Sequence, residues 1–213
     1  ELLNEETKVI ALKADSGNEK SIIDAINKTF ETFGSLDILV NNAGYGLVGE
    51  FEKYSFEETQ KMMQVNMNAL VESCYRFYPM LSGKGQAYVL NIASSTAYQA
   101  IPLMSVYAAS KVFVLNFSRG LFHEWKAKGI SVTAVSPGAT TTNFNDRANL
   151  PAKASKAAEK VTMTPAVVAK LAVDGMFAKK QEVITGFINK LGAFLAWVAP
   201  KAISEKVAKG IYE

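Results

Sequence analysis

Three side chains near the middle of this chain have the types and spacing needed to move a proton. Tyr107 and Lys111 are four residues apart, so on a helix they share one face and lie one turn from each other. An ammonium group beside a phenol stabilises the phenolate and lowers the phenol pKa from about 10 toward neutral pH. Ser94 follows the apolar run 88–92, so its hydroxyl is expected at the carboxyl edge of a sheet, where α/β proteins bind ligands. Together the three residues predict proton transfer at a carbonyl or alcohol oxygen.

The tyrosine–lysine pair carries little weight alone, because about one pair with this spacing arises by chance in such a composition. Other motifs accompany it. An Asn-Asn-Ala-Gly segment at 41–44 closes an earlier apolar run, and Ser94 precedes Tyr107 by thirteen residues. A Pro-Gly pair at 137–138, followed by Thr142, closes a later run. This combination resembles the short-chain dehydrogenase/reductase family with single-domain subunits, and the resemblance covers nearly the whole chain.

The resemblance implies four catalytic residues. Tyr107 would be the general acid and base, and Lys111 would lower its pKa and bind the nicotinamide ribose. Ser94 would hold the substrate oxygen; the family's thirteen-residue spacing to the tyrosine selects it over Ser95. Asn66 would support a proton relay at a bend in its helix. The role of Asn66 depends wholly on the resemblance, since such a residue is otherwise an ordinary polar position on a helix.

The resemblance also implies a nicotinamide cofactor, NADP or NAD, with NADP slightly favoured. On its adenosine side, Asp15 matches the acidic residue that touches the adenine. Asn41, Ala43 and Gly44 match a segment whose backbone lines the adenosine ribose. Without the family context, Asp15 is equally typical of a turn before a helix.

The Pro-Gly motif at 137–138 and Thr142 imply the nicotinamide side of the cofactor site. Pro137, Gly138 and Thr142 match the loop over the carboxamide, and Tyr107 and Lys111 complete this end. A Pro-Gly turn lets backbone approach a flat ring closely, and a hydroxyl can bond its amide.

Apolar runs and helical patterns alternate along the chain, which predicts an α/β fold with a doubly wound, Rossmann-like parallel sheet in one domain, 1–213. Asn18 is expected to cap the first helix, Gly34 to end it, and Ser55 with Glu58 to form a capping box. The predicted strands span 8–14, 36–42, 87–93, 130–136 and 182–185, and the predicted helices span 18–33, 55–78, 105–128 and 165–180.

Residues 44–49, GYGLVG, match the dinucleotide fingerprint G-x-G-x-x-G. That fingerprint requires a helix that begins within the loop, so that its amino terminus meets the pyrophosphate. Here the helix start signal is Ser55, six residues past Gly49. The sequence therefore predicts a loop at 44–49.

The family begins with a strand, a glycine-rich turn, a helix and a second strand, and this sequence opens with what resembles the end of the second helix. We expect the first strand–helix–strand portion to be absent, roughly 45–55 residues on the scale of a βαβ unit. A strand at 8–14 would then lack its neighbour and be displaced or detached. The sequence as written is expected to bind a dinucleotide weakly, because it lacks the pyrophosphate turn.

Composition excludes several kinds of protein. The chain has 213 residues, a formal net charge of +3 and no arginine-rich tract, so a nucleic-acid partner is not expected. A single cysteine, Cys74, excludes an internal disulfide and favours a reducing, cytoplasmic location. We expect Cys74 to lie in the core. A single histidine, His123, leaves no cluster for a metal site or a Ser-His triad.

Two segments are expected to surround the substrate. Residues 140–162 are polar and rich in alanine and lysine. In the family this region covers the substrate as a lid, and here Phe144 and Leu150 would be its apolar contacts. The tail, 187–213, is expected to be helical with a break at Pro200. We expect it to be a flap on the substrate entrance or a subunit contact; the alternative is a helix on a membrane surface, because lysines flank its apolar run.

The partners expected are a small carbonyl or alcohol substrate and other copies of this chain. The helices 55–78 and 105–128 carry apolar residues over wide arcs, which favours a homodimer or homotetramer. A catalytically silent scaffold or nucleotide sensor on the same fold is the alternative function. A nucleotide-sugar epimerase shares the tyrosine–lysine spacing, but the Asn-Asn-Ala-Gly segment disfavours it.

Overall fold

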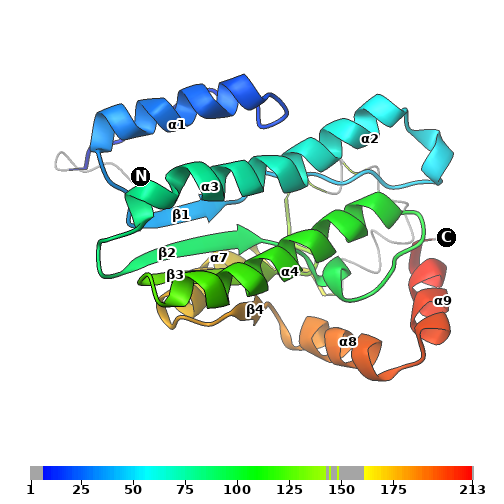
Figure 1. Ribbon diagram of the computed structural model, residues 1–213. Helices are drawn as coiled ribbons and strands as arrows, with labels where there is room; N and C mark the ends of the chain where they lie inside the picture. The colour runs from blue at the N-terminus through cyan, green and yellow to red at the C-terminus, as the bar shows by residue number, and fades with distance from the viewer. Residues whose placement is uncertain (1–6, 143, 145–147, 149–160, 213) are drawn as a thin grey trace.

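A computed structural model describes residues 7–142, 144, 148 and 161–212. These residues contain a parallel sheet of four strands in the order β1-β2-β3-β4, with helices on both faces (Figure 1). The strands are β1 (Ile38–Asn41), β2 (Ala87–Ile92), β3 (Ile130–Ser136) and β4 (Glu182–Ile184). Each strand pairs parallel with the next. The predicted Rossmann-like α/β fold is therefore confirmed.

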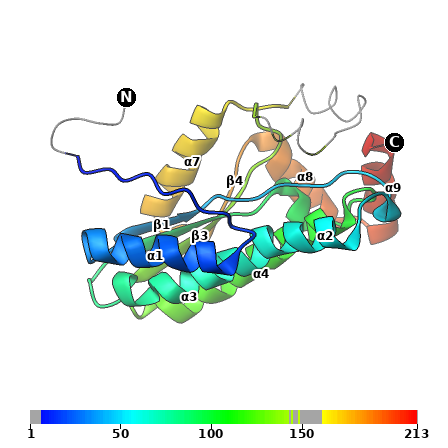
Figure 2. The same cartoon turned by 90° about the horizontal axis from the view of Figure 1, so that it is seen from above.

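Helices cover the two faces of this sheet unequally. On one face lie α3 (Ala69–Leu81) and α4 (Ser105–Lys126), with α1 (Glu19–Phe33) packed outside α3. On the other face lies α7 (Pro165–Phe177), as Figure 2 shows. The 3-10 helix η3 (Ser95–Tyr98) follows β2, and α8 (Phe187–Val198) and α9 (Lys201–Tyr212) end the described chain. Because β2 and β3 have helices on both faces, their residues are buried or half-buried throughout, and β3 buries Ser131, Thr133 and Ser136 among its apolar side chains.

The predicted helix boundaries have the capping contacts that the sequence indicated. Asn18 Oδ1 accepts a hydrogen bond from Ser21 N at 3.1 Å, and Gly34 ends α1 with φ of 68°, in the left-handed region. Ser55 and Glu58 form the capping box at the start of α2 (Phe56–Met63). The predicted helix from 55 to 78 runs on to Leu81, but a π-helical turn, η2 (Gln64–Asn68), interrupts it.

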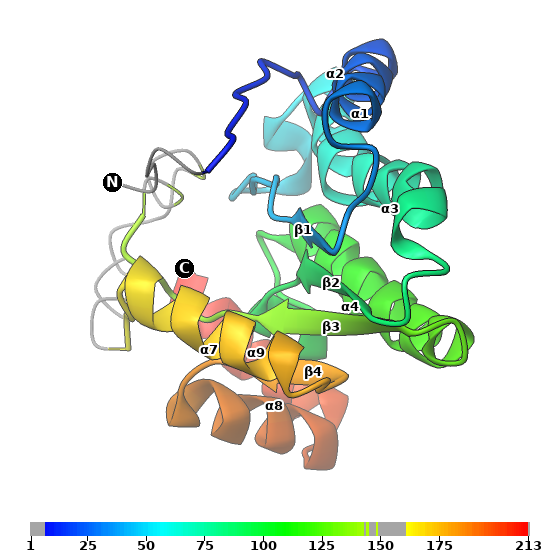
Figure 3. The ribbon, with the colours of Figure 1, turned by 90° about the vertical axis from the view of Figure 1, so that its left-hand side faces the viewer.

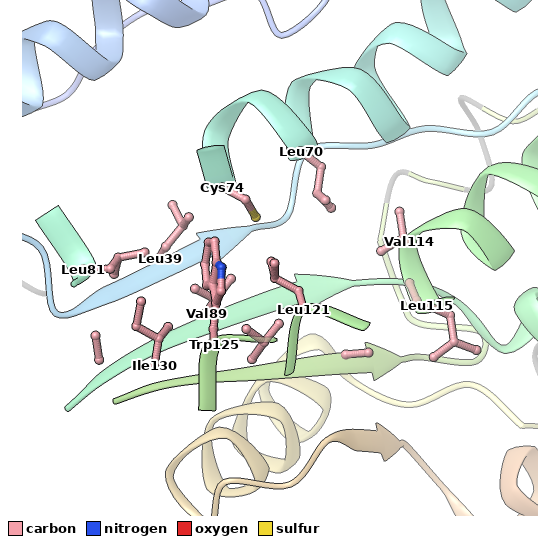
Figure 4. Packing of buried hydrophobic residues seen from close by; sticks show 14 of the residues in the cluster. Leu39, Leu70, Cys74, Leu81, Val89, Val114, Leu115, Leu121, Trp125 and Ile130 are labelled. Atoms are coloured by element: carbon pink, nitrogen blue, oxygen red, sulfur yellow. The ribbon is translucent and has the colours of Figure 1, made fainter. Parts of the chain in front are cut away.

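The largest core cluster lies between the sheet and the α3–α4 layer (Figure 4). Leu39, Val89 and Val132 point into it from successive strands. Cys74 of α3 and Trp125 of α4 close it from the helical side, which confirms the core prediction for the cysteine. Burial raises the pKa of the Cys74 thiol to about 12, so this thiol stays protonated and unreactive.

The prediction of a strand at 8–14 is wrong. Residues 7–15 form no regular element, and Val9 and Leu12 are 56% and 42% exposed. Figure 3 shows this dark-blue segment running clear of the sheet toward α1. Among the described residues, β1 is the last strand of the sheet on this side. The segment pairs neither with β1 nor with any other described strand, so its backbone lacks the hydrogen bonds of a sheet. An apolar run indicates only a tendency to extend, and a strand also needs a partner.

The segment 44–49 is a loop, as predicted. No helix begins within it; a 3-10 turn, η1 (Phe51–Lys53), follows, and α2 begins at Phe56. Glycine in this loop allows its backbone to pack closely against neighbouring side chains instead. A Cβ on Gly46 would lie 2.9 Å from Phe144 Cζ and 3.3 Å from Tyr107 Cδ2, so the loop can approach these rings only with glycine there.

Candidate active site

A cleft of about 1260 Å³ opens at the carboxyl ends of the strands, where parallel sheets bind ligands. Seven of the residues expected at the site line it, and they come from four separate stretches of the chain. They are Gly44, Ser94, Tyr107, Lys111, Pro137, Gly138 and Thr142. The sheet therefore gathers both the expected catalytic group and the expected nicotinamide loop at one place.

Tyr107 and Lys111 lie one turn apart on α4, as their spacing predicted, and both are buried. Lys111 Nζ lies 5.8 Å from the centre of the Tyr107 ring. The same ammonium donates a hydrogen bond to Ile92 O at 2.9 Å, at the end of β2. This bond fixes the lysine across the floor of the cleft, with its charge beside the tyrosine.

Burial has a direct electrostatic consequence for Lys111. Removing the ammonium from water lowers its pKa from 10.5 to about 8. The lysine therefore keeps its proton at neutral pH and releases it at moderately alkaline pH. A charge held in this way acts strongly on its neighbours, because little water is present to screen it.

Ser94 lies where β2 ends and its hydroxyl is held in place. Its Oγ accepts a hydrogen bond from Thr96 N at 3.1 Å and caps η3. The backbone on either side is tied to the β3 end: Ala93 N donates to Val135 O, and Ser95 N donates to Pro137 O, both at 2.7 Å. The serine thus cannot move independently of the Pro-Gly loop.

Asn66 does not line the cleft, but it joins three parts of the site. Its Oδ1 accepts from Tyr45 N at 3.1 Å, and its Nδ2 donates to Tyr45 O at 2.9 Å and to Ser110 Oγ at 3.1 Å. Ser110 Oγ in turn donates to Tyr107 O at 2.7 Å. A Cβ on Gly44 would lie 3.1 Å from Asn66 Oδ1 and 3.3 Å from Lys111 Nζ.

The π-helical turn explains how Asn66 reaches this position. A π turn inserts one extra residue into a helix and changes the direction of the side chains that follow. Asn66 lies within η2 and is buried, whereas Asn68 in the same turn bonds Gln64 at the surface. The expected irregularity at Asn66 is therefore present in the helix.

Pro137 and Gly138 lie under the amino end of α8, a contact that sequence reasoning did not find. A Cβ on Gly138 would lie 2.2 Å from Asn189 Nδ2, so only glycine fits beneath this side chain. Asn189 Nδ2 also donates to Thr185 O at 2.7 Å. No motif marks Asn189, because its place at the cleft results from how α8 packs.

Thr142 stands at the exposed rim of the cleft. Its hydroxyl donates to Thr140 O at 3.4 Å and accepts from Phe144 N at 3.3 Å. Phe144 contacts Tyr107 with ring centres 5.5 Å apart, as expected for a residue that covers the site. Leu150 and most of the expected lid at 140–162 lie outside the described residues.

Three residues expected near the adenosine do not line the cleft: Asp15, Asn41 and Ala43. Asp15 is exposed in the turn before α1, where Oδ1 accepts from Gly17 N at 2.8 Å. Asn41 directs its amide into the core and donates to Asn91 Oδ1 at 2.8 Å. The side chain of Asn41 therefore links β1 to β2 and is not directed at the cleft.

Much of the remaining wall of the cleft is apolar, beside uncharged polar residues such as Gln99 and Asn189. Ile101 and Met104 lie on the side of η3 and α4, and Val168 and Ala172 come from α7. Among the described lining residues, Lys111 is the one with a charged side chain. Sequence patterns did not single out these residues, since apolar positions at a cleft look the same as core positions.

Comparisons with known proteins agree with this geometry. A family model described as short chain dehydrogenase matches residues 1–153. An uncharacterized oxidoreductase of Schizosaccharomyces pombe is 37% identical over 143 residues, which are 66% of this chain and 49% of that protein. The 2-(R)-hydroxypropyl-CoM dehydrogenase of Xanthobacter autotrophicus is 34% identical over 134 residues, 62% of this chain and 54% of that protein. The chain thus spans about half the length of these curated relatives.

Two solved structures are similar over most of the chain. A short-chain dehydrogenase from Sphingobium yanoikuyae in complex with NADPH has a TM-score of 0.71 and 26% identity, covering 90% of this chain and 76% of that one. A short chain dehydrogenase from Burkholderia cenocepacia J2315 in complex with NADP has a TM-score of 0.70 and 27% identity, covering 81% and 73%.

Proposed function

This chain belongs to the short-chain dehydrogenase family, and we propose that it is an NAD(P)-dependent oxidoreductase acting on a carbonyl or secondary alcohol. One observation carries the proposal: Tyr107 and Lys111 lie buried together at the floor of a large cleft, and Ser94 lines the same cleft. A phenol, an ammonium and a hydroxyl in this arrangement are suited to proton transfer at a substrate oxygen. The members of this family whose names describe an activity are oxidoreductases or dehydrogenases.

The nicotinamide half of a dinucleotide fits the described residues. An ammonium has three donors, and the acceptor described for Lys111 is Ile92 O, so two donors remain for a ribose in the cleft. Pro137 and Gly138 offer backbone close to the same space. Within the described residues no helix begins inside a glycine-rich turn at this edge, so the pyrophosphate has no candidate contact among them. When bound, a nicotinamide cofactor supplies or accepts the hydride.

The chain's own residues manage the proton and the substrate oxygen. Tyr107 donates its phenolic proton to a carbonyl oxygen in reduction and accepts a proton from the alcohol in oxidation. Lys111 stabilises the phenolate with its buried charge. Ser94 donates a hydrogen bond to the substrate oxygen and holds it near the phenol. Asn66 acts as a positioning residue, since it holds the loop after β1 against the first turns of α4.

The walls of the cleft favour an uncharged substrate. Apart from Lys111, the described lining residues carry no charge, and Ile101, Met104 and Val168 supply apolar surface. Among the described lining residues there is no arginine to compensate a carboxylate or phosphate on the substrate for its lost hydration. We therefore infer that the substrate is a largely apolar ketone or its secondary alcohol.

The experiment that tests this function is an assay with NADPH and with NADH against a panel of ketones that differ in charge and bulk. We expect turnover of apolar ketones, with NADPH preferred, since the similar solved structures named above hold NADPH and NADP. Turnover that is absent with every ketone, in the presence of measurable cofactor binding, would instead favour a nucleotide-sensing or scaffold role.

A homodimer or homotetramer is the proposed assembly. Tyr75 on α3 and Phe113 on α4 are exposed, and Phe113 stacks on Phe117 with ring centres 6.0 Å apart. These side chains form an apolar surface on the helical layer that a second copy would cover. Light scattering at micromolar concentration should give at least twice the mass of one chain, and a monomer would contradict the proposal.

A further inference from the structure

The helix α8 carries its large apolar side chains on the side away from the protein. Phe187 and Trp197 are 78% and 76% exposed, and five others are also exposed: Ile188, Leu191, Phe194, Leu195 and Val198. Their spacing places most of them on one helical face. Figure 3 shows α8 at the margin of the molecule, below α7 and β4. Ordinarily the apolar stripe of a surface helix faces the core, so α8 has the reverse arrangement.

The inner face of α8 is built mainly from small side chains, with Ile188 as the one large apolar residue of this helix that lines the cleft. Asn189, Ala193 and Ala196 line the cleft, and Ala196 is buried. The helix therefore forms part of the wall of the cleft. This role uses the small residues, however, and does not explain the six large ones on the other side. Single exposed apolar residues are normal, whereas a contiguous set marks a surface that binds something.

Basic residues accompany the exposed apolar face. The described residues 187–212 contain four lysines and one acidic residue, Glu205. Lys190 on α8 and Lys206 on α9 are exposed, and α9 adds Ile203 and Val207 to the apolar surface. Lys201 Nζ donates to Ala196 O at 2.7 Å and so ties the start of α9 to the end of α8. Apolar side chains with lysines beside them complement an anionic lipid surface.

A bilayer surface fits α8 and α9 better than a second copy of the chain. In a two-fold contact the same patch faces itself, so the lysines of both copies would approach one another with a single glutamate to offset them. Within the described chain, no helix has the length and apolar content needed to cross a membrane. An apolar helix of 12 residues with flanking lysines can instead lie in the plane of the headgroups.

We propose that α8 and the start of α9 bind the surface of a bilayer that contains anionic lipids, with Phe194 and Trp197 inserted among the acyl chains. Phe194 and Trp197 already contact each other, with ring centres 6.3 Å apart, and so present one aromatic wedge. This surface lies outside the proposed catalytic group, and the inference does not depend on the proposed function. Binding holds the cleft beside the lipid, because the inner face of α8 is part of its wall.

Flotation of the whole chain with lipid vesicles tests the proposal. The protein should float with vesicles of phosphatidylcholine and phosphatidylglycerol, float less with phosphatidylcholine alone, and be released by salt. Trp197→Glu should weaken binding by about tenfold or more, the factor that corresponds to burying one large apolar side chain. Phe56→Glu is the matched control, because Phe56 is 80% exposed at the start of α2 and should leave binding unchanged.

Tryptophan fluorescence provides a second, independent readout. The chain has two tryptophans: Trp125 is buried in the core, and Trp197 is exposed. In Trp125→Phe the remaining fluorescence comes from Trp197 and should be quenched by brominated acyl chains in anionic vesicles. Absence of both flotation and quenching would overturn the proposal. A dimer that Trp197→Glu dissociates, without binding to vesicles, would overturn it in favour of a second copy.

Discussion

The inner wall of the cleft and its outer rim are held by different kinds of contact. Behind the inner wall, Asn66 bonds residues 21 and 44 positions away, and on the wall Lys111 bonds a carbonyl 19 positions away. At the rim, Thr142 bonds Thr140; outside the cleft, in the turn before α1, Asp15 bonds Gly17; each partner is two positions away. The inner residues are buried, whereas Asp15 and Thr142 are exposed.

This difference teaches where the molecule is preorganised. The loss of the hydrogen-bond partner of a buried polar group destabilises the fold by about 1–3 kcal/mol, whereas an exposed group forms a hydrogen bond with water instead. The inner wall therefore holds its side chains in one arrangement, as chemistry at a fixed point requires. The rim can tolerate change, because its contacts are local turns. If this contrast is correct, substitutions of similar size should have very different effects in the two regions.

Tyr107→Phe should produce the largest change in activity. The substitution removes one hydroxyl and keeps the ring that packs on Phe144. Because a general acid and base contributes about 10²–10⁴-fold, kcat/KM for an apolar ketone should fall by that factor with the fold intact. Steady-state kinetics with circular dichroism as a check of folding measures this. A variant that keeps more than about a tenth of the wild-type kcat/KM would remove Tyr107 from the proposed role.

Lys111→Met should abolish most activity and yet stabilise the protein at neutral pH. The native pKa of Lys111 is about 8, below its value of 10.5 outside the fold, so folding disfavours its charged form. At pH 7 this opposes folding by at most about 3 kcal/mol, and losing the bond to Ile92 O offsets about 1 kcal/mol. Denaturant unfolding should thus show the variant about 2 kcal/mol more stable at pH 7.

The same comparison has a defined pH dependence. Between about pH 8 and pH 10.5 the unfolded chain binds the Lys111 proton and the native protein does not, so wild-type stability rises with pH relative to Lys111→Met. Below about pH 8 the lysine is charged in both states and the difference between the two proteins is constant. A stability difference that does not change across this window would show that burial of the lysine is less complete than the structure indicates.

Asn66→Ala should lower the free energy of unfolding by about 2–3 kcal/mol, because Tyr45 N, Tyr45 O and Ser110 Oγ lose a buried partner. Activity should fall as well, mainly in kcat, if this residue positions the start of α4. Asn68→Ala is the matched control in the same π turn; its amide bonds Gln64 at the surface, so the loss should be under about 1 kcal/mol. Equal losses for the two variants would contradict the contrast between buried and exposed contacts.

Asp15→Ala should have the smallest effect. The carboxylate is exposed, and its contact with Lys61 is long, with Nζ and Oδ2 3.9 Å apart. A weak surface ion pair and one hydrogen bond within a turn together contribute about 0.5 kcal/mol to the free energy of unfolding. Chemical denaturation can set an upper limit on this loss. The predicted contact with the adenine would appear as a change in KM for the cofactor with kcat unchanged. A large loss of stability would mean that the turn before α1 matters more than its exposure indicates.

Much of the local structure was predictable from residue types. Asn18, Gly34 and the Ser55–Glu58 capping box each act within one turn of backbone, so their effects can be read from neighbouring letters. The strands β2 and β3 were predicted for a similar reason, since burial on both faces favours runs that are rich in apolar residues. The strand at 8–14 failed because strand formation depends on a partner that no local pattern supplies.

The candidate site divides in the same way. The sequence by itself determined that Tyr107 and Lys111 share one helical face, because a spacing of four is a local property of a helix. Only the tertiary structure decided that Asn66 turns inward through a π turn and that the side chain of Asn41 bonds Asn91. The position of Asn189 over Gly138 was decided in the same way. Those positions depend on which elements pack together, and packing is set by surfaces far apart in the chain. The reversed face of α8 is the clearest case: its pattern indicates an amphipathic helix, but the fold decides which face points outward.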